Sequence, residues 1–357
     1  MISPWIDALS VGGLSILVLV PFLILGKSDL LLVSTGVTAW MTALINMPHF
    51  LASYRMVYRT RESIRSHPWA AIYVPALLLA FCIFAVVASQ RTDLWISALL
   101  TVQNAYLAWH YTGQAWGMMA TYGYIEGRPF GPLERRLVRG GLYILLAWHV
   151  IWFFHLAYDT WGLTPLYDAV TIAGAVALTM GLAAFWLLRL RTGRFPPART
   201  LIPWVAIFVW YASMARFGLP ALFWVQMAHA IQYLVFPLRV EANRTLRGEY
   251  GGPSRLLRHM VVFLVLLVAF SIVAAKYLPL GAMTVVTNWL GSRPGQVVGF
   301  AILAFFNIHH YFTDGAVWKL RNPAVREDLF GHLPRPEPAK AAAPLPKTAP
   351  RRQRRAW

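Results

Sequence analysis

The stretch "FFNIHHYFTDGAVWKL", residues 305–320, closes a long apolar run that begins near residue 294. A run of this length matches the ~20 residues that a helix needs to cross about 30 Å of hydrocarbon. It nevertheless carries Asn307, His309, His310 and Asp314 within about two helical turns. Because ionisable side chains are costly in lipid, they usually face the interior of a helix bundle or a cavity. The stretch therefore predicts a membrane-spanning helix whose polar face is turned inward.

Apolar runs of similar length recur along the whole chain of 357 residues, of which 58% are hydrophobic. They predict an all-α, polytopic membrane helix bundle with about ten transmembrane helices. The predicted spans are 5–26, 30–54, 68–89, 93–120, 138–159, 166–190, 201–216, 219–238, 256–279 and 294–319. The single cysteine, Cys82, lies inside one of these runs, so a disulfide framework is excluded. The first run lacks a basic leader and a cleavage site, which predicts a retained helix.

The basic residues are distributed unevenly between the two sides of this bundle. Of the 32 Lys and Arg residues, 27 follow the second, fourth, sixth, eighth and tenth spans, and five lie elsewhere. Since basic loops stay in the cytoplasm, this pattern predicts that both termini are cytoplasmic, in a bacterial inner membrane. The net charge of +18 is then topological and does not indicate a nucleic-acid partner. Span 201–216 is short. Without it, every later segment would lie on the opposite side of the membrane, and the pattern of basic residues would be broken.

The chain divides into a transmembrane bundle, residues 1–320, and a basic tail, residues 321–357. The tail is rich in Pro, Ala and Arg, and this composition predicts a disordered cytoplasmic segment. Its arginines could contact anionic headgroups. A solvated tail that reinforces the topology is the simpler interpretation.

Seven of the ten histidines lie inside predicted spans, and five of them lie at a similar depth. At 1.5 Å per residue, these five are roughly 9 to 20 Å from the cytoplasmic ends of their helices. They are His49, His110, His149, His229 and His310. His155 lies almost two turns further out. Five separate helices are thus predicted to bring one imidazole each to a common level.

This arrangement predicts a metal site with His49, His110, His229 and His310 as ligands, and with His149 and Asp314 in reserve. Imidazole donors suit iron(II), zinc or copper(II), whereas magnesium and calcium prefer oxygen ligands. Buried histidines can instead form interhelical hydrogen bonds, which is the simpler structural interpretation.

Amide and carboxylate side chains recur near these histidines at helical spacing. Asn46, Gln226 and Asn307 each precede a candidate ligand by three residues, while Gln114 and Asp314 follow one by four. Residues three or four apart share a helix face, so these groups are predicted to orient ligand imidazoles. His309, rotated by about 100° from His310, packs elsewhere or supports a ligand indirectly. We take Asp314 and Tyr311 as candidate catalytic residues.

The four histidine segments read "NMPHFLASY" (46–54), "WHYTGQAW" (109–116), "MAHAIQY" (227–233) and "NIHHYFTDG" (307–315). In its apolar bundle and its single histidines on several helices, the chain resembles the multi-pass Brp/Blh-type carotene dioxygenases. This class-level resemblance implies a histidine-dependent, non-haem iron enzyme. The expected function is an intramembrane oxidoreductase or oxygenase acting on a lipid-phase substrate, such as an isoprenoid or an acyl chain.

Three other classes of function fit the same residues. Two histidines on facing helices could bind haem for electron transfer. A metal or proton transporter would use histidines along a pathway across the membrane. A structural or partner-binding subunit would simply bury them. The substrate, the identity of the metal and the oligomeric state are left open by the sequence.

Overall fold

The computed structural model describes residues 1–333 except residues 28, 33, 158–161 and 321, and every regular element in this part is helical. Helices are expected, because a helix satisfies its own backbone hydrogen bonds where lipid offers no partner. Seven of the described helices are long and apolar enough to cross a membrane. The protein is therefore an all-α integral membrane protein.

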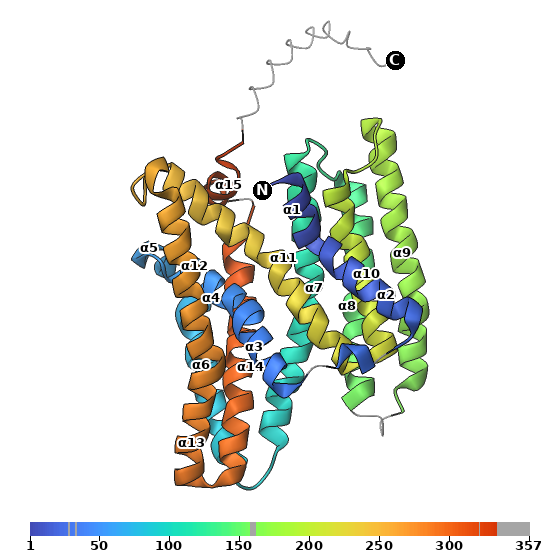
Figure 1. Cartoon of the computed structure of the whole chain (residues 1–357). Helices are drawn as coiled ribbons and strands as arrows, with labels where there is room; N and C mark the ends of the chain where they lie inside the picture. The colour runs from blue at the N-terminus through green and yellow to red at the C-terminus, as the bar shows by residue number, and fades with distance from the viewer. Residues whose placement is uncertain (28, 33, 158–161, 321, 334–357) are drawn as a thin grey trace, which may run out of the picture.

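The helical elements follow one another with short connections (Figure 1). In chain order they are α1 (Pro4–Ala8), η1 (Leu9–Gly13), α2 (Leu14–Leu25), η2 (Asp29–Leu31), α3 (Thr35–Met41), η3 (Thr42–Asn46), α4 (Met47–Tyr58), α5 (Arg61–Ser66), η4 (Trp69–Tyr73), α6 (Val74–Ala88), α7 (Leu94–Ile125), α8 (Pro132–Ala157), α9 (Thr164–Thr192), α10 (Ala198–Phe217), α11 (Leu219–Leu246), η6 (Pro253–Arg255), α12 (Leu256–Ile272), η7 (Val273–Tyr277), α13 (Leu278–Leu290), α14 (Ser292–Val317) and α15 (Pro323–Phe330).

The seven apolar spans comprise Pro4–Leu25, Trp69–Ala88, Pro132–Ala157, Thr164–Thr192, Ala198–Phe217, Leu219–Leu246 and Pro253–Leu290. The remaining three predicted spans correspond to α3–α4, α7 and α14. Each of these three carries a candidate histidine ligand together with other polar residues.

The helices form two groups joined in the middle of the molecule (Figure 1). Helices α7, α8, α9 and α10 lie in one group, and α6, α12, α13 and α14 lie in the other. Helix α11 runs obliquely across the bundle and packs against α4, α10 and α12, while α14 packs against α4, α6 and α7. Helices α4, α7, α11 and α14 consequently meet where the two groups join.

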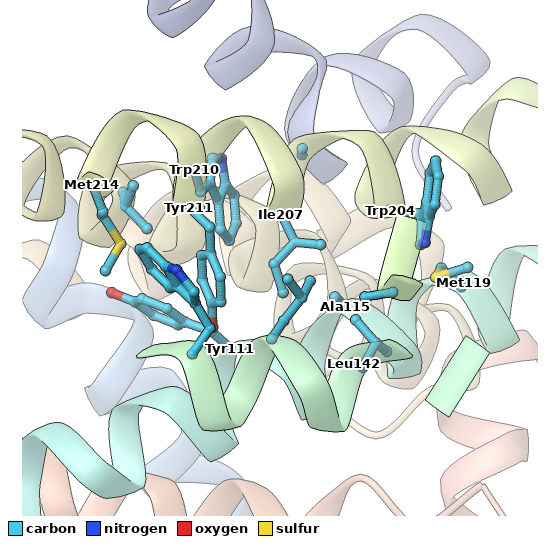
Figure 2. Packing of buried hydrophobic residues seen from close by; sticks show 14 of the residues in the cluster. Tyr111, Ala115, Met119, Leu142, Trp204, Ile207, Trp210, Tyr211 and Met214 are labelled. Carbon is cyan, nitrogen blue, oxygen red and sulfur yellow. The ribbon is translucent and has the colours of Figure 1, made fainter. Parts of the chain in front are cut away.

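Large aromatic side chains fill the interior of the first group (Figure 2). Ile207 and Trp210 of α10 project into the space between α10 and the helices α7 and α8, where Tyr111 and Leu142 lie. All four side chains are buried. This packing fixes the position and rotation of α7, which carries His110.

The first span is broken at Gly12, where it crosses α10. Gly12 has a φ of 140°, and a Cβ atom on it would lie 2.5 Å from the Cβ of Ala206. Glycine is therefore required here by both the backbone conformation and the close approach. The break frees the Val11 carbonyl, which accepts a hydrogen bond of 2.5 Å from Gln232 of α11.

Several predicted boundaries differ from the structure. The ninth span does not end at residue 279, because the helix continues through Pro279 to Leu290. Helix α7 extends to Ile125, and α8 begins at Pro132, where a loop was expected. Pro132 is tolerated because the first turn of a helix does not use its N–H group, and Pro279 directly follows the π-helical segment η7, where the regular backbone hydrogen bonding changes.

Disorder predicted from residue 321 onward does not hold for α15. This helix packs against α11, and its Leu329 is buried in a cluster with Met1 and Val11. Arg244 and Arg247 of the α11 end pair with Asp328 at 2.5 Å each. The remainder of the predicted tail, residues 334–357, lies outside the described residues.

Candidate metal centre

Four of the five histidines predicted at a common depth meet at the junction of α4, α7, α11 and α14. They are His49, His110, His229 and His310, and each is at most 4% exposed. One ring nitrogen from each lies within 4.8 Å of one ring nitrogen from every other. A π-helical turn, η3, immediately precedes the segment that carries His49, and such turns are frequent at functional sites. The four helices thus deliver four imidazoles to one point.

The orientation of His310 is set by a hydrogen bond from its outer nitrogen. His310 Nδ1 lies 2.9 Å from Ser53 Oγ, and the Ser53 hydroxyl donates to the Phe50 carbonyl at 2.7 Å. With its own hydrogen directed at Phe50, the Ser53 oxygen can accept the hydrogen of His310 Nδ1. In that tautomer, because a neutral imidazole carries one ring hydrogen, His310 Nε2 presents a lone pair to the centre of the cluster.

Hydrogen bonding alone does not account for the contacts around His110. Its Nε2 lies 3.0 Å from His229 Nε2 and 3.2 Å from His310 Nε2. A ring nitrogen of neutral imidazole offers either one hydrogen or one lone pair, so at most one of these contacts is a well-formed hydrogen bond. The other contact is then the weak second arm of a shared hydrogen bond, or it brings two lone pairs or two N–H groups toward each other. A cation between the nitrogens would instead accept a lone pair from each ring.

His49 and His229 also carry buried nitrogens without a partner in the described chain. These are both nitrogens of His49 and Nδ1 of His229. Leaving a buried polar group unsatisfied costs roughly 1–3 kcal/mol. Metal coordination would give a partner to one nitrogen of His49, whereas Nδ1 of His229 lies on the side of its ring away from the Nε2 that faces His110.

The two shortest nitrogen separations in the cluster fit a metal ion. With metal–nitrogen bonds of about 2.0–2.1 Å, neighbouring ligand nitrogens lie roughly 2.8–3.4 Å apart in six- or four-coordinate geometry. The two Nε2 separations around His110, 3.0 and 3.2 Å, lie in this range. Four imidazoles form a donor set that suits zinc, copper, iron or nickel. The geometry does not distinguish between these metals.

Asp314 lies beside this cluster and not among the four nitrogens. Its Oδ2 is 3.9 Å from His110 Nδ1. This is the ring nitrogen opposite Nε2, which contacts the other histidines. Its Oδ1 accepts a hydrogen bond of 2.8 Å from Trp318 Nε1, which also lies 2.9 Å from the Tyr233 hydroxyl. The carboxylate is therefore anchored next to a candidate ligand, where it can polarise the ring.

The amides predicted to orient the histidines contact other groups. Asn307 donates to the Leu303 carbonyl at 2.8 Å and accepts from the Tyr311 hydroxyl at 3.2 Å. Gln114 donates to the His229 carbonyl at 3.2 Å, so it holds the backbone of that residue and not its ring. Asn46 is buried and Gln226 is partly buried, and no side-chain hydrogen bond to a candidate ligand is described for either.

Two other predicted site histidines lie apart from the cluster. His149 is buried on α8, where its Nδ1 lies 3.3 Å from the Tyr211 hydroxyl, and the ring of Tyr111 separates it from His229. Its helix packs against α7 and α9, on the side of α7 away from the cluster. His309 turns away from His310, and its Nε2 lies 2.8 Å from the Ala70 carbonyl.

Tyr311, predicted as a catalytic residue, lies between the cluster and an apolar cleft. Its ring packs on that of His110, with centroids 4.7 Å apart and planes inclined by 31°. Tyr311 also lines a cleft of about 780 Å³ between α7, α8 and α14. Trp109 and Tyr106 line this cleft and are 47% and 38% exposed, so it opens toward the lipid.

The sequence interpretation missed Ser53, Tyr233 and Trp318 as supporting residues. Ser53 follows His49 by four residues, and Trp318 follows Asp314 by four, so helical spacing offered a signal for both. Neither spacing identifies the actual partner of Ser53, which is His310 on another helix.

No protein family, curated protein or solved structure matches this chain. The interpretation of the site therefore rests on its own geometry.

Proposed function

We propose that His49, His110, His229 and His310 hold a metal ion within the membrane, and that this centre oxidises a lipid-phase substrate. The observation that carries the proposal is the convergence of four buried imidazoles whose nitrogen contacts cannot all be well-formed hydrogen bonds. A donor set of this kind, far from bulk water, suits chemistry on an apolar molecule. An isoprenoid or an acyl chain is the substrate class that fits.

Iron is the metal that we propose. Magnesium and calcium are disfavoured by an all-nitrogen donor set. Zinc fits the ligands but has no redox chemistry, whereas oxidation requires a redox-active metal such as iron or copper. Iron(II), when bound, would supply reactivity toward dioxygen, which dissolves in lipid. This assignment agrees with the class-level resemblance to the Brp/Blh-type dioxygenases.

The residues of the chain have distinct roles in this proposal. The four histidines bind the metal, Ser53 holds His310 with Nε2 facing inward, and Asp314 polarises the ring of His110 from the side of its Nδ1. Tyr311 separates the cluster from the cleft, and its hydroxyl is occupied by Asn307. We assign Tyr311 to orienting the apolar substrate.

Haem binding is less well supported by this geometry. Neighbouring rings in the cluster have centroid separations of 4.6–5.2 Å. Two axial histidines must hold a flat macrocycle between them, and four rings in mutual contact leave no plane for it. A transport pathway would require polar groups at successive depths, whereas these histidines share one level.

For the membrane topology, we propose ten spans with both termini on the cytoplasmic side of a bacterial inner membrane. The distribution of basic residues, 27 against five, supports this arrangement. The packing of Met1 against Leu329 of α15 supports it as well, because it brings the two ends of the described chain to one side. The cluster then lies nearer the cytoplasmic face than the external face.

Elemental analysis of the detergent-purified protein tests the metal site. We expect close to stoichiometric iron, and its loss in His110→Ala. His149→Ala provides the matched control, because it removes a buried histidine from outside the cluster. Oxygen consumption by the iron-loaded protein in the presence of isoprenoid or unsaturated acyl lipids would then test the oxidation. Stoichiometric metal without oxygen consumption would retain the site and refute the proposed reaction.

A further inference from the structure

We propose that the cleft between α7, α8 and α14 binds an amphiphile with a single anionic headgroup, whose apolar chain extends toward Tyr311. This inference deepens the proposed function by naming the class of substrate, and it rests on that function for the chemistry that follows binding. The binding itself depends on the cleft alone.

The cleft has the size and the lining of a lipid site. Its volume of about 780 Å³ lies within the range of small-molecule pockets. Ala105, Leu146, Val150 and Phe312 make its interior apolar. Such a surface accepts a hydrocarbon chain and offers little to a polar molecule.

Polar groups are confined to one end of this cleft. Ser66, His67 and Lys319 line the end that lies next to the basic segment 55–67 and the end of α14. His67 Nδ1 is held by the Ser63 carbonyl at 3.0 Å. Lys319 is exposed, and no ion pair is described for it within residues 1–333. A cation at the membrane interface with an apolar channel behind it is complementary to an anionic headgroup with a hydrocarbon chain.

The geometry also indicates which part of such a molecule would approach the histidines. The six residue steps from Tyr311 to Val317 correspond to a rise of about 9 Å along α14. Lys319 lies beyond the end of this helix. A headgroup at Lys319 therefore places an internal position of the chain, and not the headgroup, beside Tyr311. Because the ring of Tyr311 packs on His110, this position is the one nearest the metal centre.

Gly315 keeps the middle of the cleft open. A Cβ atom on Gly315 would lie 3.4 Å from the indole of Trp109, so a larger side chain would project into the cleft. Gly113 on α7 is a matched control, because it is exposed, does not line the cleft and has open space around its Cβ position.

The test uses a photoactivatable stearate, crosslinked to the full-length protein in nanodiscs of neutral phosphatidylcholine and mapped by mass spectrometry. We expect crosslinks on α7 and α14, and displacement by stearate about fivefold more effective than by stearylamine. Lys319→Glu should reverse this preference. Inorganic phosphate and acetate should not compete, since they lack the chain. Gly315→Leu should abolish labelling of the cleft, and Gly113→Leu should not.

Iron content is measured in every variant, so that the two proposals can fail separately. Crosslinking as expected in a protein without metal would refute the metal centre and retain the amphiphile site. Retained iron without labelling of the cleft, or equal displacement by stearate and stearylamine in both the wild type and Lys319→Glu, would overturn the inference. If Gly315→Leu does not fold, the test rests on the surface variant Lys319→Glu and its preference between stearate and stearylamine.

Discussion

Ser53 Oγ of α4 is hydrogen-bonded to His310 Nδ1 of α14 at 2.9 Å. This contact joins residues 257 positions apart and selects the ring nitrogen that His310 presents to the other histidines. Orienting contacts of this kind commonly change metal affinity by about 10- to 100-fold when they are removed.

Ser53→Ala should therefore lower metal affinity by about 10- to 100-fold without unfolding the protein. Without the serine oxygen, the ring hydrogen of His310 is free to move to Nε2, where it blocks coordination. Competition with a chelator measures the affinity. Ser213→Ala is the matched control, because Ser213 is also buried but its hydroxyl contacts none of the described polar groups. Equal affinity in both variants would remove Ser53 from the site.

Replacing any one of the cluster histidines should remove the metal. We expect His110→Ala, His229→Ala and His310→Ala to lose it, because each takes one of a small number of donors out of a buried site. His67→Ala and His332→Ala should retain it. Elemental analysis after gel filtration provides the measurement. Full occupancy in all three cluster variants would contradict the site.

Asp314→Asn distinguishes a supporting carboxylate from a direct ligand. The substitution keeps the shape of the side chain and its hydrogen bond to Trp318 but removes the negative charge beside His110. We expect metal affinity or turnover to fall about 10- to 100-fold with folding intact. Complete loss of metal would identify Asp314 as a ligand. Unchanged affinity together with unchanged turnover would exclude it from the site.

The docking of α15 on the bundle should weaken in acid because of His332. Partial burial, with the positive charges of Arg239 and the N-terminal ammonium, lowers the pKa of His332 from 6.5 to about 4. When α15 is undocked, His332 therefore takes up a proton at a higher pH than when α15 is docked. Docking is fully stable above about pH 6.5, and its stability falls as the pH drops toward 4.

Hydrogen exchange of residues 323–333 as a function of pH measures this effect. Protection should decrease between pH 6.5 and 4 in the wild type, and the decrease should be smaller in His332→Gln, which cannot be protonated. An identical pH dependence in the two proteins would show that another group is responsible.

The topology can be tested without reference to the site. A reporter fused after Trp357 should be cytoplasmic, and one inserted between residues 159 and 166 should be external, because basic segments remain in the cytoplasm. An external reporter at the C-terminus would contradict the ten-span arrangement and the common depth of the histidines.

The sequence determined that this protein is a membrane-embedded helix bundle, since apolar runs of sufficient length have no other stable form in lipid. It also predicted a common depth for five histidines, because residue count and helical rise give position along a helix axis. It even singled out the four residues that meet, although it could not separate them from His149.

Only the tertiary structure decided which side chains at that depth face one another. The rotation of each helix and the identity of its neighbours depend on packing between segments that are distant in sequence. Tyr111 fills the space between His149 and the cluster, and Ser53 meets His310 across two helices. Asn307 binds Tyr311 instead of the histidine three residues away. Spacing along one helix specifies which residues share a face, but interhelical packing specifies what that face contacts.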